Sequence, residues 1–365
     1  MVAWKGKSLI IGDLKASLPI IQGGMGIGVS LSGLAGAVAN VGGIGVISTA
    51  GIGMLEKDFT SNYLEANVRA LKNEIRKARA LSKGKGLLGL NIMVAQSIFS
   101  EMVNTAIDEG IDIIFSGAGL PLNLPEFLKG SKKPKLVPVV SSSRAAKLIA
   151  KVWMDKHQYA PDAIVVEGPL AGGHLGFKPE QIDDPDYQLE KLLPQVINEA
   201  KNIADKAGKT VPVIAAGGIY TGADIYKFLQ MGAAGVQMAT RFVTTDECDA
   251  DIEFKKAYLS CKKENLEIIK SPLGMPGRAI INQYLKDVNA GIKKPYKCPY
   301  HCIIPCDYKD SPYCIALALI NAKLGKMDEG FAFAGANAYR AEKIVSVKEL
   351  VDTLIEEYNE AASIN

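Results

Sequence analysis

Short runs of apolar residues recur along the chain, and each ends in small or polar residues before a helical pattern begins. Most runs are continuous rather than alternating, which is typical of parallel strands with both faces buried. Eight such runs predict eight strands: Pro19–Gln22, Ile44–Ser48, Leu87–Met93, Ile111–Ser116, Leu136–Ser141, Ala163–Glu167, Val211–Ala216 and Gly235–Thr240.

Segments with helical spacing separate these runs and carry recognisable start and stop residues. Strands alternating with helices indicate the α/β class, and eight of them favour a closed (β/α)8 TIM barrel. An open doubly wound sheet is the alternative, because a strand count does not establish closure. The predicted helices run from Thr60–Ser61 to Ala80, over Ser97–Glu109, from Ser141–Ser143 to about Lys156, and over Leu192–Ala207, Thr221–Leu229 and Val347–Ala361.

The β/α rhythm breaks after strand eight. Residues 244–330 hold a helical stretch, a Pro/Gly turn at Ser271–Gly277 and a cysteine-rich loop, which is too long for an ordinary connection. We expect a barrel over 1–243, a lid or cap over 244–330, and a segment with a helix over 331–365 that packs back on the barrel.

Composition narrows the class of partner. The chain has 365 residues, with 42 Lys and Arg against 39 Asp and Glu, and a formal net charge of +3. With no basic stripe, we expect no nucleic-acid partner. Neither a signal-peptide core nor a run of about 18 apolar residues is present, so we expect a cytoplasmic protein with reduced cysteines. The oligomeric state stays open, a homo-oligomer included.

Glycines cluster after the last two predicted strands, in VPVIAAGGI from Val211 and GVQMATRF from Gly235. In barrels the loops after strands seven and eight commonly bind a phosphate through backbone N–H groups, which a side chain would obstruct. Gly217 and Gly218 would form this site, with the Thr240 hydroxyl and Arg241 as a counter-charge. The alternative is that these glycines serve only turns and packing.

Two further glycine clusters follow strands one and six. QGGMGIG at Gln22 lacks the spacing and the later acidic residue of a dinucleotide-binding fingerprint, so we exclude that site and expect close backbone approach to a flat ring. AGGHLG at Ala171 places His174 on a glycine-rich loop at the catalytic end of a barrel. The alternative for His174 is a structural role.

Together these motifs resemble the nitronate monooxygenase family, whose pattern includes the flavin-dependent enoyl-acyl-carrier-protein reductases. The resemblance covers about residues 15–340. It is carried by PIIQGGMGIGVS, GGIGVIS, GLNIM, SGAG, EGPLAGGHLG, VPVIAAGGI, GVQMATRF, SPLGMPGRAIIN and FAFAGANAY.

The resemblance implies noncovalent FMN at the carboxyl end of the barrel, with His174 as the acid or base beside it. The residues that it assigns to FMN are Gly23, Gly24, Met25, Asn91, Ser116, Glu167, Gly172, Gly173, Ala216, Gly217, Gly218, Gln237, Met238, Ala239 and Thr240.

A cysteine block departs from the family pattern. Cys298, Cys302, Cys306 and Cys314 follow the spacing C-x3-C-x3-C-x7-C, with His301 inside. Four close thiols are suited to an iron–sulfur cluster or zinc, although the spacing matches neither common pattern. Reduced thiols packed in the lid and a redox disulfide are the alternatives.

Several functions fit these features. The leading prediction is an FMN-dependent nitronate monooxygenase that converts alkyl nitronates and O2 to carbonyl compounds and nitrite. An NAD(P)H-dependent enoyl-thioester reductase is the second, since both use one flavin site. A flavoprotein redox carrier with an iron–sulfur centre and a phosphate-binding isomerase or lyase without flavin are further alternatives.

Overall fold

The computed structural model describes residues 2–131, 134–292, 298 and 300–364, and a closed barrel of parallel strands forms its centre. Closure is completed where the last strand pairs with the first, with Val236 opposite Ile20. This confirms the predicted TIM barrel and excludes the open sheet. The strands are β3 (Ile20–Gln22), β4 (Ile44–Ser48), β5 (Leu87–Met93), β6 (Ile113–Gly117), β7 (Lys135–Val140), β8 (Ile164–Glu167), β10 (Val213–Ala216) and β11 (Gly235–Met238).

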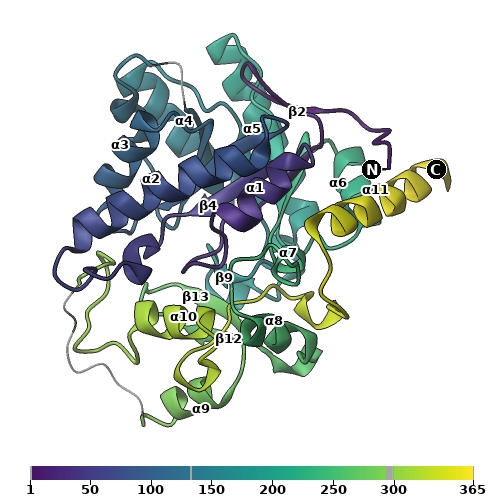
Figure 1. Cartoon of the computed structure of the whole chain (residues 1–365). Helices are drawn as coiled ribbons and strands as arrows, with labels where there is room; N and C mark the ends of the chain where they lie inside the picture. The colour runs from purple at the N-terminus through teal and green to yellow at the C-terminus, as the bar shows by residue number, and fades with distance from the viewer. Residues whose placement is uncertain (1, 132–133, 293–297, 299, 365) are drawn as a thin grey trace.

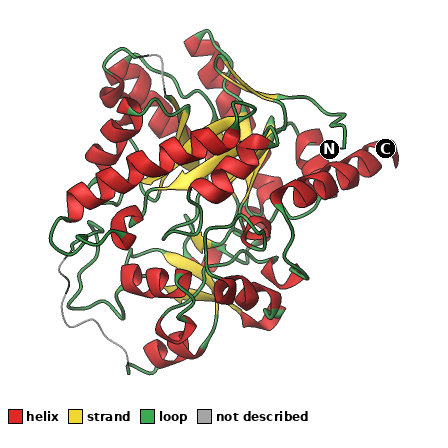
Figure 2. Cartoon of the chain, viewed as in Figure 1, coloured by secondary structure: helices red, strands yellow, loops and turns green. Residues whose placement is uncertain are grey.

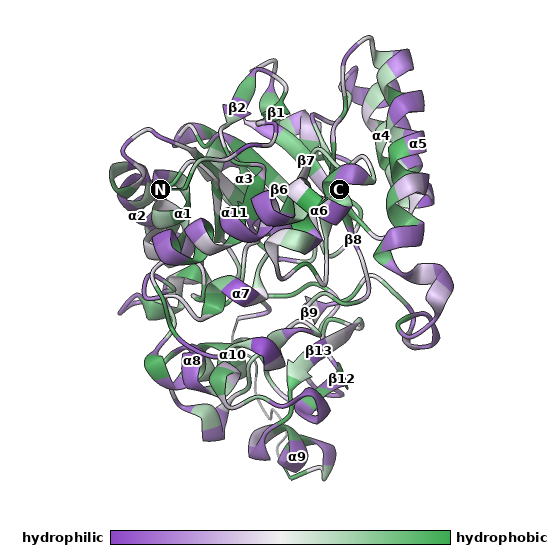
Figure 3. Ribbon diagram, turned by 90° about the vertical axis from the view of Figure 1, so that its right-hand side faces the viewer, coloured by the Kyte–Doolittle hydropathy of each residue, from purple (hydrophilic) through white to green (hydrophobic). Residues whose placement is uncertain are grey.

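Helices surround the barrel, as Figure 2 shows. Their apolar faces turn towards the strands and their polar faces outwards, which is visible on α4 and α5 (Figure 3). Thr221 caps α6, because its Oγ1 accepts from the Asp224 amide at 3.1 Å while the Asp224 carboxylate accepts from the Thr221 amide at 2.9 Å. The helices are α1 (Ser32–Asn40), α2 (Tyr63–Ser82), α3 (Phe99–Asp108), α4 (Ser143–His157), α5 (Leu189–Ala207) and α6 (Gly222–Gln230).

An N-terminal hairpin of β1 (Leu9–Ile11) and β2 (Leu14–Ala16) closes the barrel at the amino ends of its strands. Its buried side chains alternate with exposed ones and pack with strand residues inside the barrel. The sequence analysis missed this hairpin, because three-residue strands leave too short an alternation to recognise.

After α7 (Thr240–Val243) the chain leaves the barrel and builds a second tier, the lid (Figure 1). Here β13 pairs with β12 and with β9 (Gly173–His174), the two-residue strand in the loop after β8. The histidine motif of the barrel is therefore one strand of the lid sheet. The lid elements are α8 (Ile252–Leu259), β12 (Leu266–Lys270), β13 (Pro276–Ile280), α9 (Gln283–Asn289) and α10 (Ile315–Lys323).

The last helix, α11 (Val347–Ile364), returns to the barrel and packs between α6 and α1. The approach to α6 is close, since a Cβ on Gly222 would lie 2.2 Å from the Leu354 carbonyl oxygen. Along the chain, the helix that completes the ring around the barrel therefore comes after the lid. Short 3-10 turns fill the connections: η1 (Ile52–Leu55), η2 (Leu124–Leu128), η3 (Pro179–Gln181), η4 (Pro185–Tyr187), η5 (Lys263–Asn265), η6 (Met327–Glu329) and η7 (Ala338–Arg340).

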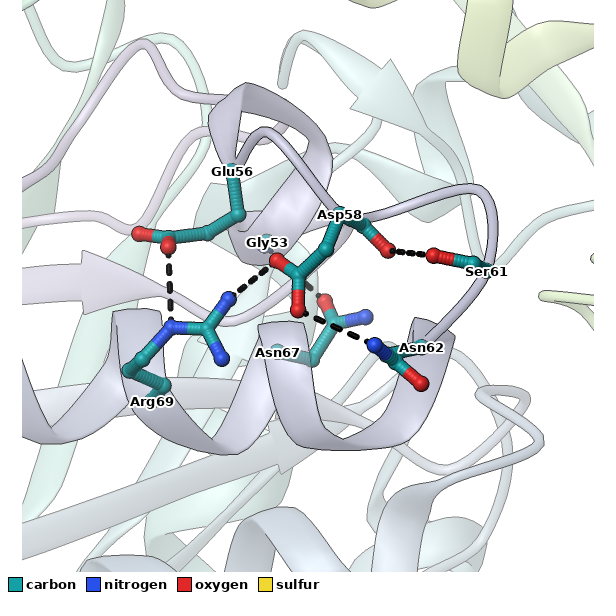
Figure 4. A network of polar contacts seen from close by, with 7 residues as sticks. All are labelled: Gly53, Glu56, Asp58, Ser61, Asn62, Asn67 and Arg69. Atoms are coloured by element: carbon teal, nitrogen blue, oxygen red, sulfur yellow. Dashed lines mark hydrogen bonds and ion pairs between the residues drawn. The ribbon is translucent and has the colours of Figure 1, made fainter.

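A polar network fixes the loop after β4 to α2 (Figure 4). Arg69 pairs with Glu56 at 3.0 Å and with Asp58, and the Asn67 side chain accepts from the Gly53 amide at 3.0 Å. The loop carries Phe59, whose ring lies 4.8 Å from that of Tyr300 in the cysteine block. Barrel and lid therefore also meet through aromatic rings.

Within the described part of the chain, no helix has the length and apolar character needed to cross a bilayer.

Candidate active site

One large cavity of about 240 Å³ lies at the carboxyl ends of the barrel strands, beneath the lid. This is the end at which barrel enzymes bind their ligands. Fifteen predicted site residues line it together: Gly23, Gly24, Met25, Asn91, Glu167, Gly172, Gly173, His174, Ala216, Gly217, Gly218, Gln237, Met238, Ala239 and Thr240.

Ser116 does not reach the cavity, and its assignment to the cofactor is corrected here. Its side chain is fully buried in the barrel wall, where the hydroxyl donates to the Ile92 carbonyl at 2.8 Å. The next two residues, Gly117 and Ala118, line the cavity instead. Alternate side chains of a strand point to opposite faces, so an offset of one residue decides which of them faces a ligand.

At one end of the cavity, small residues from three segments form a cradle. Gly217 has a φ of +92°, and a Cβ there would lie 2.6 Å from the Gly168 carbonyl oxygen. The Asn337 side chain donates to the Gly218 carbonyl at 2.6 Å, and Thr240 Oγ1 accepts from the Gly335 amide at 3.0 Å. Asn337 and Gly335 were not predicted as site residues, although both lie in FAFAGANAY, one of the motifs that carry the family resemblance.

Arg241 does not provide the expected counter-charge. Its Nη1 donates to the Tyr220 carbonyl at 2.7 Å, and its Nη2 lies 3.7 Å from Glu357 on α11. The guanidinium thus joins the cradle loop to the last helix from outside the cavity.

Two glycines of the cavity wall are tightly packed. A Cβ on Gly24 would lie 2.4 Å from the Asn91 Cβ, and one on Gly172 would lie 2.5 Å from the Ala334 carbonyl carbon. Neither position therefore has space for a side chain.

His174 projects from β9 at the border between barrel and lid. Its Nε2 lies 2.6 Å from the Ser271 hydroxyl, and its ring packs edge-on against Phe333 with centroids 5.0 Å apart. Burial lowers the pKa of His174 to about 4, so the imidazole is neutral at pH 7. The sequence could not reveal Ser271 as its partner, because the two lie 97 positions apart.

Arg278 on β13 holds the loop that carries His174. Its guanidinium is buried, and Nη1 donates to the carbonyls of Pro169 at 2.5 Å and Ala171 at 2.8 Å. The pairing of Gly277 with His174 continues the same attachment through the backbone. The position of His174 is thus set by the lid as much as by the barrel.

Glu167, at the end of β8, is a second titratable group that lines the cavity. Burial raises its pKa to about 7. No lysine or arginine occurs among the described residues that line the cavity. Its interior is therefore weakly charged and suited to a neutral ring system.

A smaller apolar cavity of about 40 Å³ continues from the first past His174. The two share Ala50, Met93, His174 and Leu319. The smaller cavity ends at Cys302 of the cysteine block, so it extends from the imidazole into the lid.

The four cysteines of the block line a third cavity together. Burial, together with the nearby thiols of Cys314, Cys298 and Cys306, raises the pKa of Cys302 to about 12. Across the described residues, no three His, Cys, Asp or Glu side chains are arranged to hold a single metal ion. Zinc is therefore not supported. Cys248 and Cys261 are buried elsewhere.

Comparison with known families agrees with this geometry. Residues 7–357 match the sequence model of the family described as nitronate monooxygenase. The chain belongs to the nitronate monooxygenase family. This confirms the resemblance drawn from the motifs and the prediction of a flavin-dependent oxidoreductase.

Relatives of this family member carry the names of different enzymes. A "(3aS,4S,5R,7aS)-5-hydroxy-7a-methyl-1-oxo-octahydro-1H-indene-4-carboxyl-CoA dehydrogenase" of Mycobacterium tuberculosis is 29% identical over 273 residues, 75% of this chain. The chain spans only 66% of that relative's length. A "Probable nitronate monooxygenase" of Staphylococcus saprophyticus is 26% identical over 77% of this chain and 80% of its own length.

Solved structures share the fold. FabK from Thermotoga maritima aligns with a TM-score of 0.71 at 24% identity, over 96% of this chain and 95% of its own. Nitroalkane oxidase from Streptomyces ansochromogenes aligns with a TM-score of 0.71 at 22% identity, over 96% and 98%. At these identities the likeness concerns the fold alone.

Proposed function

We propose that this family member is an FMN-dependent enzyme that oxidises alkyl nitronates, or the nitroalkanes from which they form, to carbonyl compounds and nitrite with O2. The observation that carries the proposal is a neutral imidazole, His174, at the rim of a weakly charged cavity with a glycine cradle at its other end.

The residues present fit FMN. Gly217 and Gly218, with Thr240, would hold the phosphate, because all three line the cavity and glycines leave backbone N–H groups accessible to an anion. The cavity that Gly24 and Gly172 line, with no lysine or arginine among its described lining residues, would take the flat ring. Bound there, the flavin supplies the acceptor for the substrate's electrons.

His174 would act on the proton of the substrate. A neutral imidazole accepts a proton from a carbon acid, whereas protonation of an enolate carbon needs the imidazolium. With Nε2 engaged by Ser271, Nδ1 is the nitrogen left for the α-carbon of a nitroalkane. Because burial keeps the imidazole unprotonated at neutral pH, His174 is available as a proton acceptor and not as a donor.

Anaerobic stopped-flow mixing tests the proposal. Ethylnitronate and propyl-1-nitronate should bleach the flavin rapidly, and O2 should restore the colour with release of nitrite. With nitroethane as substrate, His174→Gln should slow flavin reduction by about 100-fold or more, the usual contribution of a general base. His157→Gln, at the far end of α4, is the matched control and should keep the parent rate.

A second candidate is a flavin-dependent oxidoreductase of acyl thioesters, such as an NAD(P)H-dependent enoyl-thioester reductase. The named CoA-ester dehydrogenase relatives and the apolar cavity beside His174 favour it. Rapid bleaching by NADH or NADPH together with turnover of crotonyl-CoA, and no reaction with nitronates, would replace the first proposal with this one.

A further inference from the structure

The cysteine block of the lid forms a cavity of its own. Cys298, Cys302, Cys306 and Cys314 all line it, and apolar residues such as Ile303 and Ile315 complete its wall. The mechanism proposed above does not use these thiols. Four cysteines around one cavity, none in a disulfide, therefore remain without a role.

The arrangement discriminates between kinds of metal site. A tetrahedral zinc ion with Zn–S bonds of about 2.3 Å would bring its sulfur ligands to about 4 Å from one another. No such convergence on a point occurs among the described residues. An iron–sulfur cluster instead takes each thiolate at a different corner of a larger core, so its ligands surround a hollow. The four thiols of the block line one cavity, which is the arrangement that a cluster requires.

We propose that Cys298, Cys302, Cys306 and Cys314 are the ligands of an iron–sulfur cluster in the lid. Cys314 is the N-cap residue of α10, a nine-residue helix, and the backbone amides of Ala316 and Leu317 are directed at its sulfur. Amide donors and the positive helix end stabilise the negative charge of a thiolate-bound cluster.

The loop that carries these cysteines is attached firmly to the barrel. The Ile304 amide donates to the Ala95 carbonyl at 2.9 Å, and the Ser97 amide donates to the Cys302 carbonyl at 3.2 Å. An isolated antiparallel bridge joins Ile303 to Gln96 between them. The partner segment directly follows β5, the strand of Asn91, so the cluster site is fixed relative to the main cavity.

The location of the cluster site would allow it to exchange electrons with the flavin. Cys302 lines the apolar cavity that also contains His174, and that cavity shares four residues with the flavin cavity. The oxidised cluster would take one electron from flavin that the substrate has reduced, and the flavin would release one proton to water. This role rests on the flavin proposed above, whereas the cluster site does not.

Chemical analysis of the whole chain, purified without oxygen, tests the site. We expect iron and acid-labile sulfide in equal amounts, and an electron paramagnetic resonance signal after reduction by dithionite. Both should persist after the flavin has been stripped, which separates failure of this proposal from failure of the flavin proposal.

Single substitutions assign the ligands. Cys302→Ser and Cys306→Ser should each lose most of the iron and the signal, while Cys261→Ser, a buried cysteine outside the block, should keep both. Cys306 is the safer of the two for folding because it is less buried, and an unchanged melting temperature would show that the loss is local.

Three outcomes would overturn the cluster: zinc in place of iron, a disulfide within the block in the anaerobic protein, or four free thiols after reconstitution with iron and sulfide. Full iron content in Cys306→Ser would remove Cys306 from the ligand set and with it the four-cysteine site.

Discussion

His174 and Glu167 face one cavity, yet burial moves their pKa values in opposite directions. The pKa of His174 falls from 6.5 to about 4, and that of Glu167 rises from 4.5 to about 7. Between these values the unfolded chain binds more protons than the native protein at His174 and fewer at Glu167. The two contributions to the pH dependence of stability therefore oppose each other from about pH 4.5 to 6.5.

Single substitutions should separate the two contributions in the flavin-free protein. Relative to the parent protein, the free energy of unfolding of Glu167→Gln should rise by about 3 kcal/mol as the pH increases from 4.5 to 7, because the contribution of Glu167 is removed. Relative to the parent protein, that of His174→Gln should fall by about 3 kcal/mol from pH 4 to 6.5. Urea unfolding at a series of pH values measures both slopes. Equal slopes in the two variants would contradict the assigned pKa values.

Gly217 tests the cradle. Its positive φ and the nearby Gly168 carbonyl leave no place for a side chain, so Gly217→Ala should weaken FMN binding by about 10-fold or more. Gly208→Ala is the matched control, because Gly208 also has a positive φ, of +64°, but open space around it. The control should lose a little stability and no affinity. Fluorescence titration of stripped protein with FMN compares them, and equal affinities would exclude the cradle as the phosphate site.

Sequence reasoning, mainly the family resemblance, named fifteen of the residues that line the cavity, several of them glycines in the loops after strands. It failed where a side chain's direction depends on strand register, as at Ser116, and where a polar side chain has a nearer partner, as at Arg241. Ser271 begins the familial motif SPLGMPGRAIIN, but its contact with His174 could not be predicted, because the pairing of β13 with β9 brings the two segments together.

At the scale of elements, Arg278 joins β13 to the loop of His174. In Arg278→Met the carbonyls of Pro169 and Ala171 would lose a charged donor inside the protein, at a cost of about 3 kcal/mol. We expect lower stability and, at temperatures where the fold persists, slower flavin reduction. Arg144→Met on the exposed side of α4 should change the free energy of unfolding by less than about 0.5 kcal/mol. A parental reduction rate in a destabilised Arg278→Met would show that Arg278 does not position His174.

The eight barrel strands were predictable because each lies within an apolar run that alternates regularly with helical segments, so that even the three-residue β3 was recognised. The hairpin β1–β2 and the strand β9 have two or three residues each, and tertiary pairing rather than local sequence defines them. The capped helices α4 and α6 began where Ser142 and Thr221 predicted.

For the molecule as a whole, α11 follows the lid in the chain and completes the ring of helices around the barrel. Gly222→Ala would place a methyl group against the Leu354 carbonyl, and we expect it to destabilise the whole protein by about 1–3 kcal/mol. Ala223→Ser, one position on and exposed, is the control. Thermal unfolding followed by circular dichroism and by flavin release should give one common transition at a lower temperature. An unchanged melting temperature would mean that α6 and α11 can separate at little cost.

The pairing of β9 with β13 has a consequence for selectivity. The imidazole is aligned only while the lid sheet is intact, so a compound too bulky for that sheet to stay paired would still enter the cavity but meet a misdirected base. Discrimination by size would then appear in kcat more than in KM, because it acts on the reacting geometry and not on admission. In this enzyme the fit of the lid would set which bound molecules react.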